Sequence, residues 1–236
     1  MSSLNSSKKT IAFIEVVAFV AFALLSKKFL DPVSWRYSGP VSLITTVVLL
    51  TIYMRLRGQN WSSMGLRPLP GVRAILLVVP QAALIFIAVL TIVNLVTFGL
   101  EVIGLQFMSE VPEGEEERWG DVAGNLRLYL LLLALSWISA GFAEEMFFRG
   151  FLITRLCTIF KGVKFAPIFA ILLPALLFGY VHLYYQGLYG FVNAGVIGLI
   201  LGTFFLLYRR NLWPLIFAHG FINSLGFTAD FFGWDI

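Results

Sequence analysis

The sequence predicts an all-α fold, a polytopic membrane helical bundle of about seven transmembrane helices. Of its 236 residues, 59% are hydrophobic and 13% are charged, whereas soluble proteins average about 45–50% apolar and about 25% charged residues. Crossing the hydrocarbon core of a bilayer takes about 20 residues, and apolar runs of that kind recur along the whole chain. Their expected bounds are 10–29, 40–55, 73–99, 126–148, 165–183, 188–208 and 211–229.

The first apolar run is expected to be a transmembrane helix and not a secretory signal peptide. Lys8 and Lys9 precede it, and Ala21, Phe22 and Ala23 have the pattern of a cleavage site. The run continues beyond that site, however, and further spans follow. A retained first helix is therefore the simpler prediction.

The distribution of basic residues predicts the orientation in the membrane. With these spans, most Lys and Arg residues fall in loops on the same side as the N-terminus, and the acidic run EVPEGEEERWGD (110–121) falls on the opposite side. Because cytoplasmic loops carry an excess of Lys and Arg, we expect a cytoplasmic N-terminus. The expected location is a prokaryotic plasma membrane, which the compact length permits. The chain has no basic stripe or motif for nucleic acid, so the expected partner at this point is the lipid bilayer and not a nucleic acid.

The polar, acidic segment 101–125 is the main change of composition along the chain. We take it as an extramembrane loop between N-terminal transmembrane helices (1–100) and a C-terminal helical domain (126–228). The N-terminal part contains one acid inside an apolar run, Glu15, and nothing in it indicates catalysis. Chemistry is therefore expected in the C-terminal part.

The stretch GFAEEMFFRG (141–150) places three charges beside an apolar run. Residues four apart share one face of a helix, so Glu145 and Arg149 can form an ion pair, while Glu144 points about 100° away. Ionisable residues inside a membrane are functional candidates by default, and Glu144 is left available as a base or ligand. The alternative is an interfacial charge network without a catalytic role.

Two further segments carry the only histidines of the protein. FGYVH (178–182) places Phe178 and His182 on one face, and HGFIN (219–223) does the same for His219 and Asn223. Each histidine alone fits a satisfied core or interfacial residue, and an asparagine in a span can simply hydrogen-bond between helices. Taken together with Glu144, they supply a general base and donors for an oxyanion, which a hydrolytic site needs.

The three segments also resemble a known family. EEMFFR (144–149), FGYVH and HGFIN match the patterns EExxxR, FxxxH and HxxxN, in the order typical of the CPBP family of intramembrane proteases, which includes the CAAX prenyl endopeptidases and the Abi, bacteriocin-processing proteins. The resemblance covers about 126–228, and the upstream MGLRP (64–68) is similar to a connector of many members. It implies an intramembrane endopeptidase of CAAX type that cuts a membrane-associated protein or peptide.

The resemblance implies a role for each motif residue. Glu144 and His182 would activate water, and His219 and Asn223 would stabilise the oxyanion. Glu145, Arg149 and Phe178 would be supporting residues. Members of the family have been described as metal-independent glutamate proteases and as metalloproteases; we favour no cofactor. Zinc is the alternative, and its ligands would then be Glu144, His182 and His219, since catalytic zinc commonly has three protein ligands.

The predicted spans place these residues at different depths. Glu144 would lie toward the inner end of its span, His219 slightly inside the midplane and His182 toward the outer end. A common site therefore requires either a kink or shift in the span of His182, or span bounds that are wrong by a turn or more.

Two other classes of function remain as hypotheses. One is a non-catalytic membrane interaction protein, such as a bacteriocin-immunity protein, that binds its target through the same helices. The other is a small transporter with proton coupling, against which stands the absence of the internal repeat that many secondary transporters show.

Overall fold

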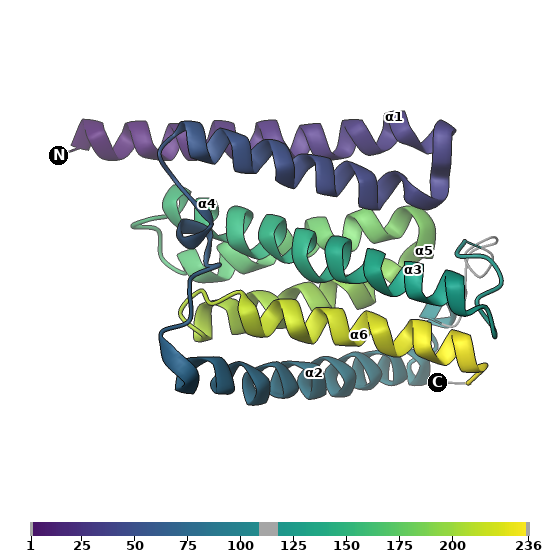
Figure 1. The fold of residues 1–236 in the computed structure, drawn as a ribbon. Coiled ribbons are helices and arrows are strands. Elements are labelled where there is room, and N and C mark those ends of the chain that lie inside the picture. Colours follow the sequence, from purple (N-terminus) through teal and green to yellow (C-terminus); the bar gives the residue numbers. More distant parts are fainter. Residues whose placement is uncertain (1, 109–117, 235–236) are drawn as a thin grey trace.

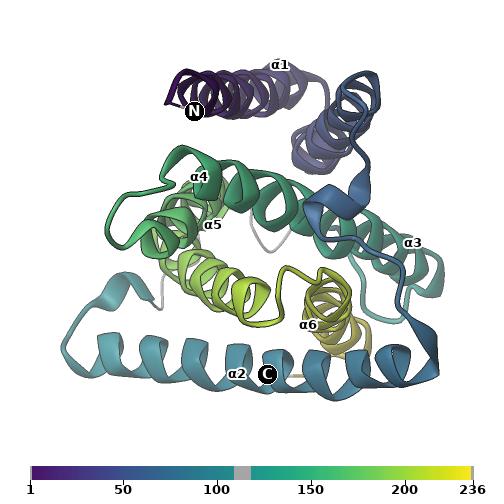
Figure 2. The same cartoon turned by 90° about the vertical axis from the view of Figure 1, so that its left-hand side faces the viewer.

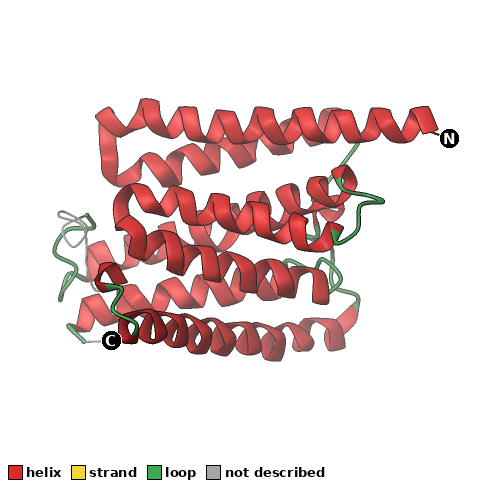
Figure 3. Cartoon of the chain, turned by 180° about the vertical axis from the view of Figure 1, so that it is seen from behind, coloured by secondary structure: helices red, strands yellow, loops and turns green. Residues whose placement is uncertain are grey.

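The computed structural model describes residues 2–108 and 118–234, and within these ranges the chain is helical and contains no strand (Figures 1 and 3). The elements in chain order are α1 (Ser2–Leu56), η1 (Trp61–Met64), α2 (Gly71–Val102), η2 (Gln106–Met108), α3 (Leu126–Ser136), η3 (Trp137–Ile153), α4 (Thr154–Ile159), α5 (Ala166–Leu207) and α6 (Trp213–Phe232). The predicted all-α membrane bundle is confirmed.

Six helices of the described chain are long and apolar enough to cross a membrane. They are Ser6–Leu30, Trp35–Leu56, Gly71–Val102, Leu126–Ile159, Ala166–Leu207 and Trp213–Phe232. The first two are the arms of α1, which bends at Ser34 (φ −160°, ψ 91°). The prediction of about seven spans differs from this count because 165–183 and 188–208 both fall within α5.

Helix α5 is itself bent, at Gly187 (φ 61°, ψ −157°). Only glycine adopts this backbone region readily. A straight helix of its 42 residues would be about 63 Å long, whereas the hydrocarbon core is about 30 Å thick. The two arms instead run antiparallel and in contact, since a Cβ on Gly198 of the second arm would lie 2.9 Å from Cα of Ala175 in the first. Small residues permit this approach.

The span that carries the two adjacent glutamates is longer than predicted. The sequence predicts 126–148, but α3, η3 and α4 form one span, Leu126–Ile159. The predicted end of the span at 148 is wrong because the charges beside it do not face an aqueous interface. Glu145 and Arg149 are buried inside the bundle. Glu144 therefore lies near the middle of its span, and this correction resolves the predicted difference in depth.

This central span is surrounded by the rest of the chain. Figure 2 shows the α1 hairpin on one side and α2 on the other, with α3 to α6 between them. Helix α1 packs against η3 and α4, and α6 packs against η3, α3 and α2. A polar contact fixes the α1 hairpin, because Arg155 Nε lies 2.5 Å from Glu15 Oε2, and Tyr53 of the second arm donates a 2.8 Å hydrogen bond to Glu15 Oε1.

The connections gather at two opposite ends of the bundle (Figure 1). The N-terminus and the loops 57–70, 160–165 and 208–212 share one end, where Lys9 Nζ donates to the Lys161 carbonyl at 2.8 Å. The described part of the connection 103–125 and the C-terminal residues lie at the other end. Most of the predicted acidic run (110–121) lies outside the described residues, which omit 109–117. The division into parts 1–100, 101–125 and 126–228 and the cytoplasmic N-terminus stay predictions.

Candidate active site

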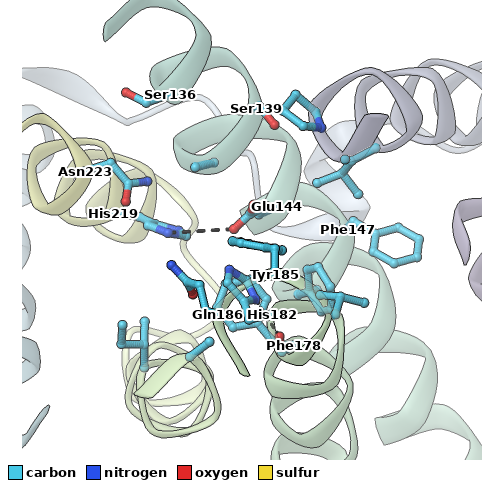
Figure 4. Close-up of a pocket in the computed structure, with 18 of the residues that line it drawn as sticks. Ser136, Ser139, Glu144, Phe147, Phe178, His182, Tyr185, Gln186, His219 and Asn223 are labelled. Atoms are coloured by element: carbon cyan, nitrogen blue, oxygen red, sulfur yellow. Dashed lines mark hydrogen bonds and ion pairs between the residues drawn. The ribbon is translucent and has the colours of Figure 1, made fainter. Parts of the chain in front are cut away.

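The three sequence motifs meet at one cavity of about 440 Å³ inside the bundle. Glu144 from η3, His182 from α5, and His219 and Asn223 from α6 all line it (Figure 4). The remaining wall is mainly apolar and includes residues of both α1 arms. The predicted site residues, which are up to 79 positions apart in the sequence, are thus brought together.

Close helix packing places α6 against η3. A Cβ on Gly220 would lie 2.7 Å from ring carbons of Trp137, and a Cβ on Gly141 would lie 3.4 Å from Cα of Gly220. Neither position has room for a larger side chain without displacement of its neighbour. The two glycines therefore allow His219, next to Gly220, to reach the glutamates of η3.

Glu145 is the centre of a buried network. Its Oε1 accepts hydrogen bonds from Arg149 Nη1 and from His219 Nδ1, both at 2.8 Å. The exposed fraction is 0% for Glu145, 1% for Arg149 and 5% for His219. Because an ionised carboxylate only accepts hydrogen bonds, the shared proton of this contact belongs to Nδ1 of His219. The other ring nitrogen, Nε2, is left for the cavity.

Glu144 lies on the cavity side of the same imidazole. Its Oε2 is 3.7 Å from His219 Nε2, and 18% of its side chain is exposed. The spacing of an α-helix predicts that Glu144 points about 100° away from Glu145, yet both carboxylates lie beside the His219 ring. Residues Trp137–Ile153 form a π-helix, whose wider turns reduce the angle between consecutive side chains.

With Glu145 ionised and Arg149 charged, the charges of the four groups at this point can sum to zero in two ways. Either both glutamates are ionised and His219 is protonated beside Arg149, or Glu144 holds the proton and His219 is neutral. Uncompensated charge is costly in a low-dielectric interior, which favours these two states. They differ by transfer of one proton between His219 and Glu144.

His182 is oriented by its own helix. Its Nδ1 is 2.7 Å from the backbone carbonyl of Phe178, and since a carbonyl can only accept, Nδ1 carries the proton. A neutral His182 therefore has its lone pair on Nε2. The ring packs on Phe178 at 4.6 Å between centroids, and the Phe178 ring also lies 4.8 Å from the Arg149 guanidinium. Phe178 thus supports two of the motif side chains.

Asn223 lies one helical turn after His219 and also lines the cavity. Its side chain makes no hydrogen bond to other described residues, and its amide is available to a ligand. Within the described chain, no three His, Cys, Asp or Glu side chains are arranged to hold a metal ion. The zinc alternative, with Glu144, His182 and His219 as ligands, stays a prediction.

Sequence reasoning missed two features of the site. It did not find the link between Glu145 and His219, because the contact joins two elements 74 positions apart. It also placed Arg118 in an exposed acidic loop, whereas Arg118 is buried and borders the cavity. The adjacent Trp119, an aromatic residue in an otherwise charged run, is the signal that could have indicated burial.

Residues 126–225 match the family described as type II CAAX prenyl endopeptidase Rce1-like. This part of the chain is similar to that family. The match confirms the resemblance predicted from the three motifs at nearly the same bounds. We refer to residues 126–225 as the Rce1-like segment; it contains all four predicted catalytic residues, whereas Arg118 and the α1 wall of the cavity lie outside it. No curated protein and no solved structure matched the chain.

Proposed function

We propose that the protein is an intramembrane endopeptidase of CAAX type that hydrolyses a peptide bond of a membrane-associated protein or peptide. The observation that carries the proposal is the shared cavity: a carboxylate, two imidazoles and an amide line one apolar chamber among membrane-spanning helices. The Rce1-like segment supplies all four groups. Hydrolysis inside a bilayer needs this combination of an apolar site for the chain and polar groups for water and oxyanion.

Glu144 and His182 are proposed to activate water. The Glu144 carboxylate takes one proton from the water as its oxygen bonds to the scissile carbonyl carbon, while His182 Nε2 accepts a hydrogen bond from the other water hydrogen. The available lone pair follows from the contact of Nδ1 with the Phe178 carbonyl. When the C–N bond breaks, Glu144 returns the proton to the leaving nitrogen, which gives one carboxylic acid and one amine.

His219 and Asn223 are proposed to stabilise the oxyanion. In the protonation state with both glutamates ionised, His219 Nε2 carries a proton that points to the cavity side. Asn223 contributes its amide N–H from the next turn of α6. Glu145 holds the His219 ring through Nδ1, and Arg149 holds Glu145. Loss of one oxyanion donor typically lowers kcat by about 10²–10³-fold, which sets the expectation for Asn223→Ala.

The test is cleavage of prenylated CAAX-type peptides and of other membrane-associated peptides by the purified full chain in detergent. Glu144→Gln is compared with wild type and with Glu101→Gln, a matched change at an exposed position of α2. We expect the Glu144 variant to lose about 10²–10⁴-fold in rate and the Glu101 variant to retain it. Each reaction is repeated with a chelator.

Three outcomes would count against the proposal. Equal cleavage by wild type and Glu144→Gln would show that Glu144 is not the base, and cleavage that a chelator stops and zinc restores would replace the metal-independent mechanism. If neither wild type nor Glu144→Gln cleaves a peptide, and the variant keeps the phenotype that the wild-type protein gives in cells, the non-catalytic interaction or bacteriocin-immunity hypothesis is favoured.

A further inference from the structure

The cavity borders a buried cation that the proposed chemistry does not use. Arg118 lines the same chamber as Glu144, and only 6% of its surface is exposed. Its guanidinium carbon lies 5.3 Å from the ring centroid of Trp35, 4.6 Å from that of Trp119 and 3.9 Å from that of Tyr185. Rings of this kind cover the faces of a guanidinium, and its N–H edge stays available for hydrogen bonds.

Other cations in and around the cavity have carboxylate partners. Lys27 also lines the cavity, but its Nζ is 3.0 Å from Asp31. The second fully buried arginine of the described chain, Arg149, is paired with Glu145 at 2.8 Å. No carboxylate of the described residues lies within 4.0 Å of the Arg118 nitrogens, and its Nε has no hydrogen-bond partner there.

A buried cation such as Arg118, with no carboxylate beside it among the described residues, is costly. The penalty for removing such a charge from water amounts to several kcal/mol, and cation–π contacts of about 2 kcal/mol for a desolvated ring offset only part of it. The aromatic cage thus holds the guanidinium in place without neutralising its charge. A carboxylate that enters the cavity would complete the pairing, and an Arg fork matches a carboxylate with two parallel hydrogen bonds.

We propose that Arg118 binds the C-terminal carboxylate of the peptide substrate and thereby determines specificity for a free C-terminus. This inference rests on the proposed function, because the C-a-a-X motif lies at the very end of a chain. A bond cut within it is only a few residues from the terminal carboxylate. Since Glu144 and Arg118 border one cavity of about 440 Å³, one peptide end can occupy both positions.

The test uses three prenylated peptides of the same length. One has a free C-terminal carboxylate, one has a C-terminal amide, and one has the amide with aspartate as its last residue. Cleavage of each is measured with wild type, Arg118→Gln, Arg118→Lys and the control Arg127→Gln, which changes an exposed arginine at the same end of the bundle that does not line the cavity.

Wild type should prefer the free acid over the amide by about 10- to 100-fold in kcat/KM, the usual range for a hydrogen-bonded charge. Arg118→Gln should lose this preference because kcat/KM falls much more on the free acid than on the amide, and Arg118→Lys should keep an intermediate preference. Arg127→Gln should behave as wild type. A change in substrate preference separates recognition from a purely structural role, which would lower all rates together.

Three results would overturn the inference. The first is equal cleavage of the acid and amide peptides by wild type, and the second is an equal loss of cleavage rate on both peptides in Arg118→Gln. The third is cleavage of the amide peptide with terminal aspartate as fast as that of the free acid, which would show that Arg118 binds an acidic side chain and not specifically the C-terminal carboxylate. Binding of the labelled peptides to Glu144→Gln protein keeps this test independent of catalysis. Acid-selective binding that needs Arg118, without cleavage by wild type, would refute the proposed hydrolysis and retain the carboxylate site.

Discussion

The two adjacent glutamates should give opposite phenotypes. Glu145 is fully buried and accepts from both Arg149 and His219 at 2.8 Å. Glu144 has a partly exposed side chain, and its polar contact in the site is the 3.7 Å approach to His219. Glu145→Gln should therefore lower the free energy of unfolding. Glu144→Gln should abolish peptide cleavage and leave the fold intact.

The magnitudes follow from the contacts. Glu145→Gln removes the charge that compensates Arg149, and breaking a buried pair in this way costs about 3–5 kcal/mol. The Arg149 Nη2 atom already has no hydrogen-bond partner in the described structure, so no second acceptor is ready to replace the carboxylate. For Glu144→Gln we expect less than about 1 kcal/mol, because the change breaks no short hydrogen bond.

A double variant separates stability from positioning. Replacing a buried ion pair by apolar residues of similar size is often neutral, and Glu145→Met with Arg149→Met should recover most of the stability lost in Glu145→Gln. His219 would still lack the carboxylate that holds its Nδ1. We therefore expect the double variant to be folded and slow, with kcat reduced more than KM is changed.

The assay is reversible unfolding in mixed detergent, followed by the peptide cleavage assay on the same preparations. Wild-type stability in Glu145→Gln would refute the account of the buried network. Equal destabilisation by Glu144→Gln would refute the distinction between the two carboxylates, and full activity in the double variant would show that Glu145 does not position His219.

Three further predictions concern the fold around the site. Glu15→Ala leaves Arg155 without its 2.5 Å partner and should lower stability by about 3 kcal/mol in the same unfolding assay; an unchanged midpoint would contradict a role in fixing the α1 hairpin. Gly220→Ala places a Cβ 2.7 Å from the ring of Trp137 and should cost about 1–3 kcal/mol and reduce kcat, whereas a fully active, stable variant would show that α6 has room to move. A cysteine at Lys164, in a cysteine-free background, should react with an impermeant thiol reagent only after cells are opened, because the N-terminal end is predicted to be cytoplasmic; labelling of intact cells would reverse the orientation.

The parts of the site that depend on local spacing could be predicted from the sequence. An i, i+4 relation is enough to pair Glu145 with Arg149 and to place Asn223 one turn from His219, and the structure contains both arrangements. The apolar runs likewise indicate the spans, because the length needed to cross a bilayer is fixed by its thickness.

Features that depend on tertiary contacts could not be predicted in this way. The contact of Glu145 with His219 requires the close approach of α6 to η3, which two glycines permit. The true length of the glutamate-bearing span was hidden because charge alone cannot distinguish an aqueous boundary from a buried ion pair. Arg118 was predicted to lie in an extramembrane loop because its charge does not reveal its surroundings. The aromatic rings around it come from three separate segments, which only the tertiary structure brings together.

The residues that line the cavity come partly from the Rce1-like segment and partly from the chain before it. The groups proposed to act on the peptide bond belong to the Rce1-like segment, whereas the α1 wall, between Val20 and Leu43, and Arg118 come from outside it. On these proposals, the reacting groups are encoded in the Rce1-like segment, and part of the substrate choice is encoded in the stretch that precedes it. The preceding stretch could diverge, or be exchanged between relatives by engineering, to admit new peptides while the reacting groups stay unchanged.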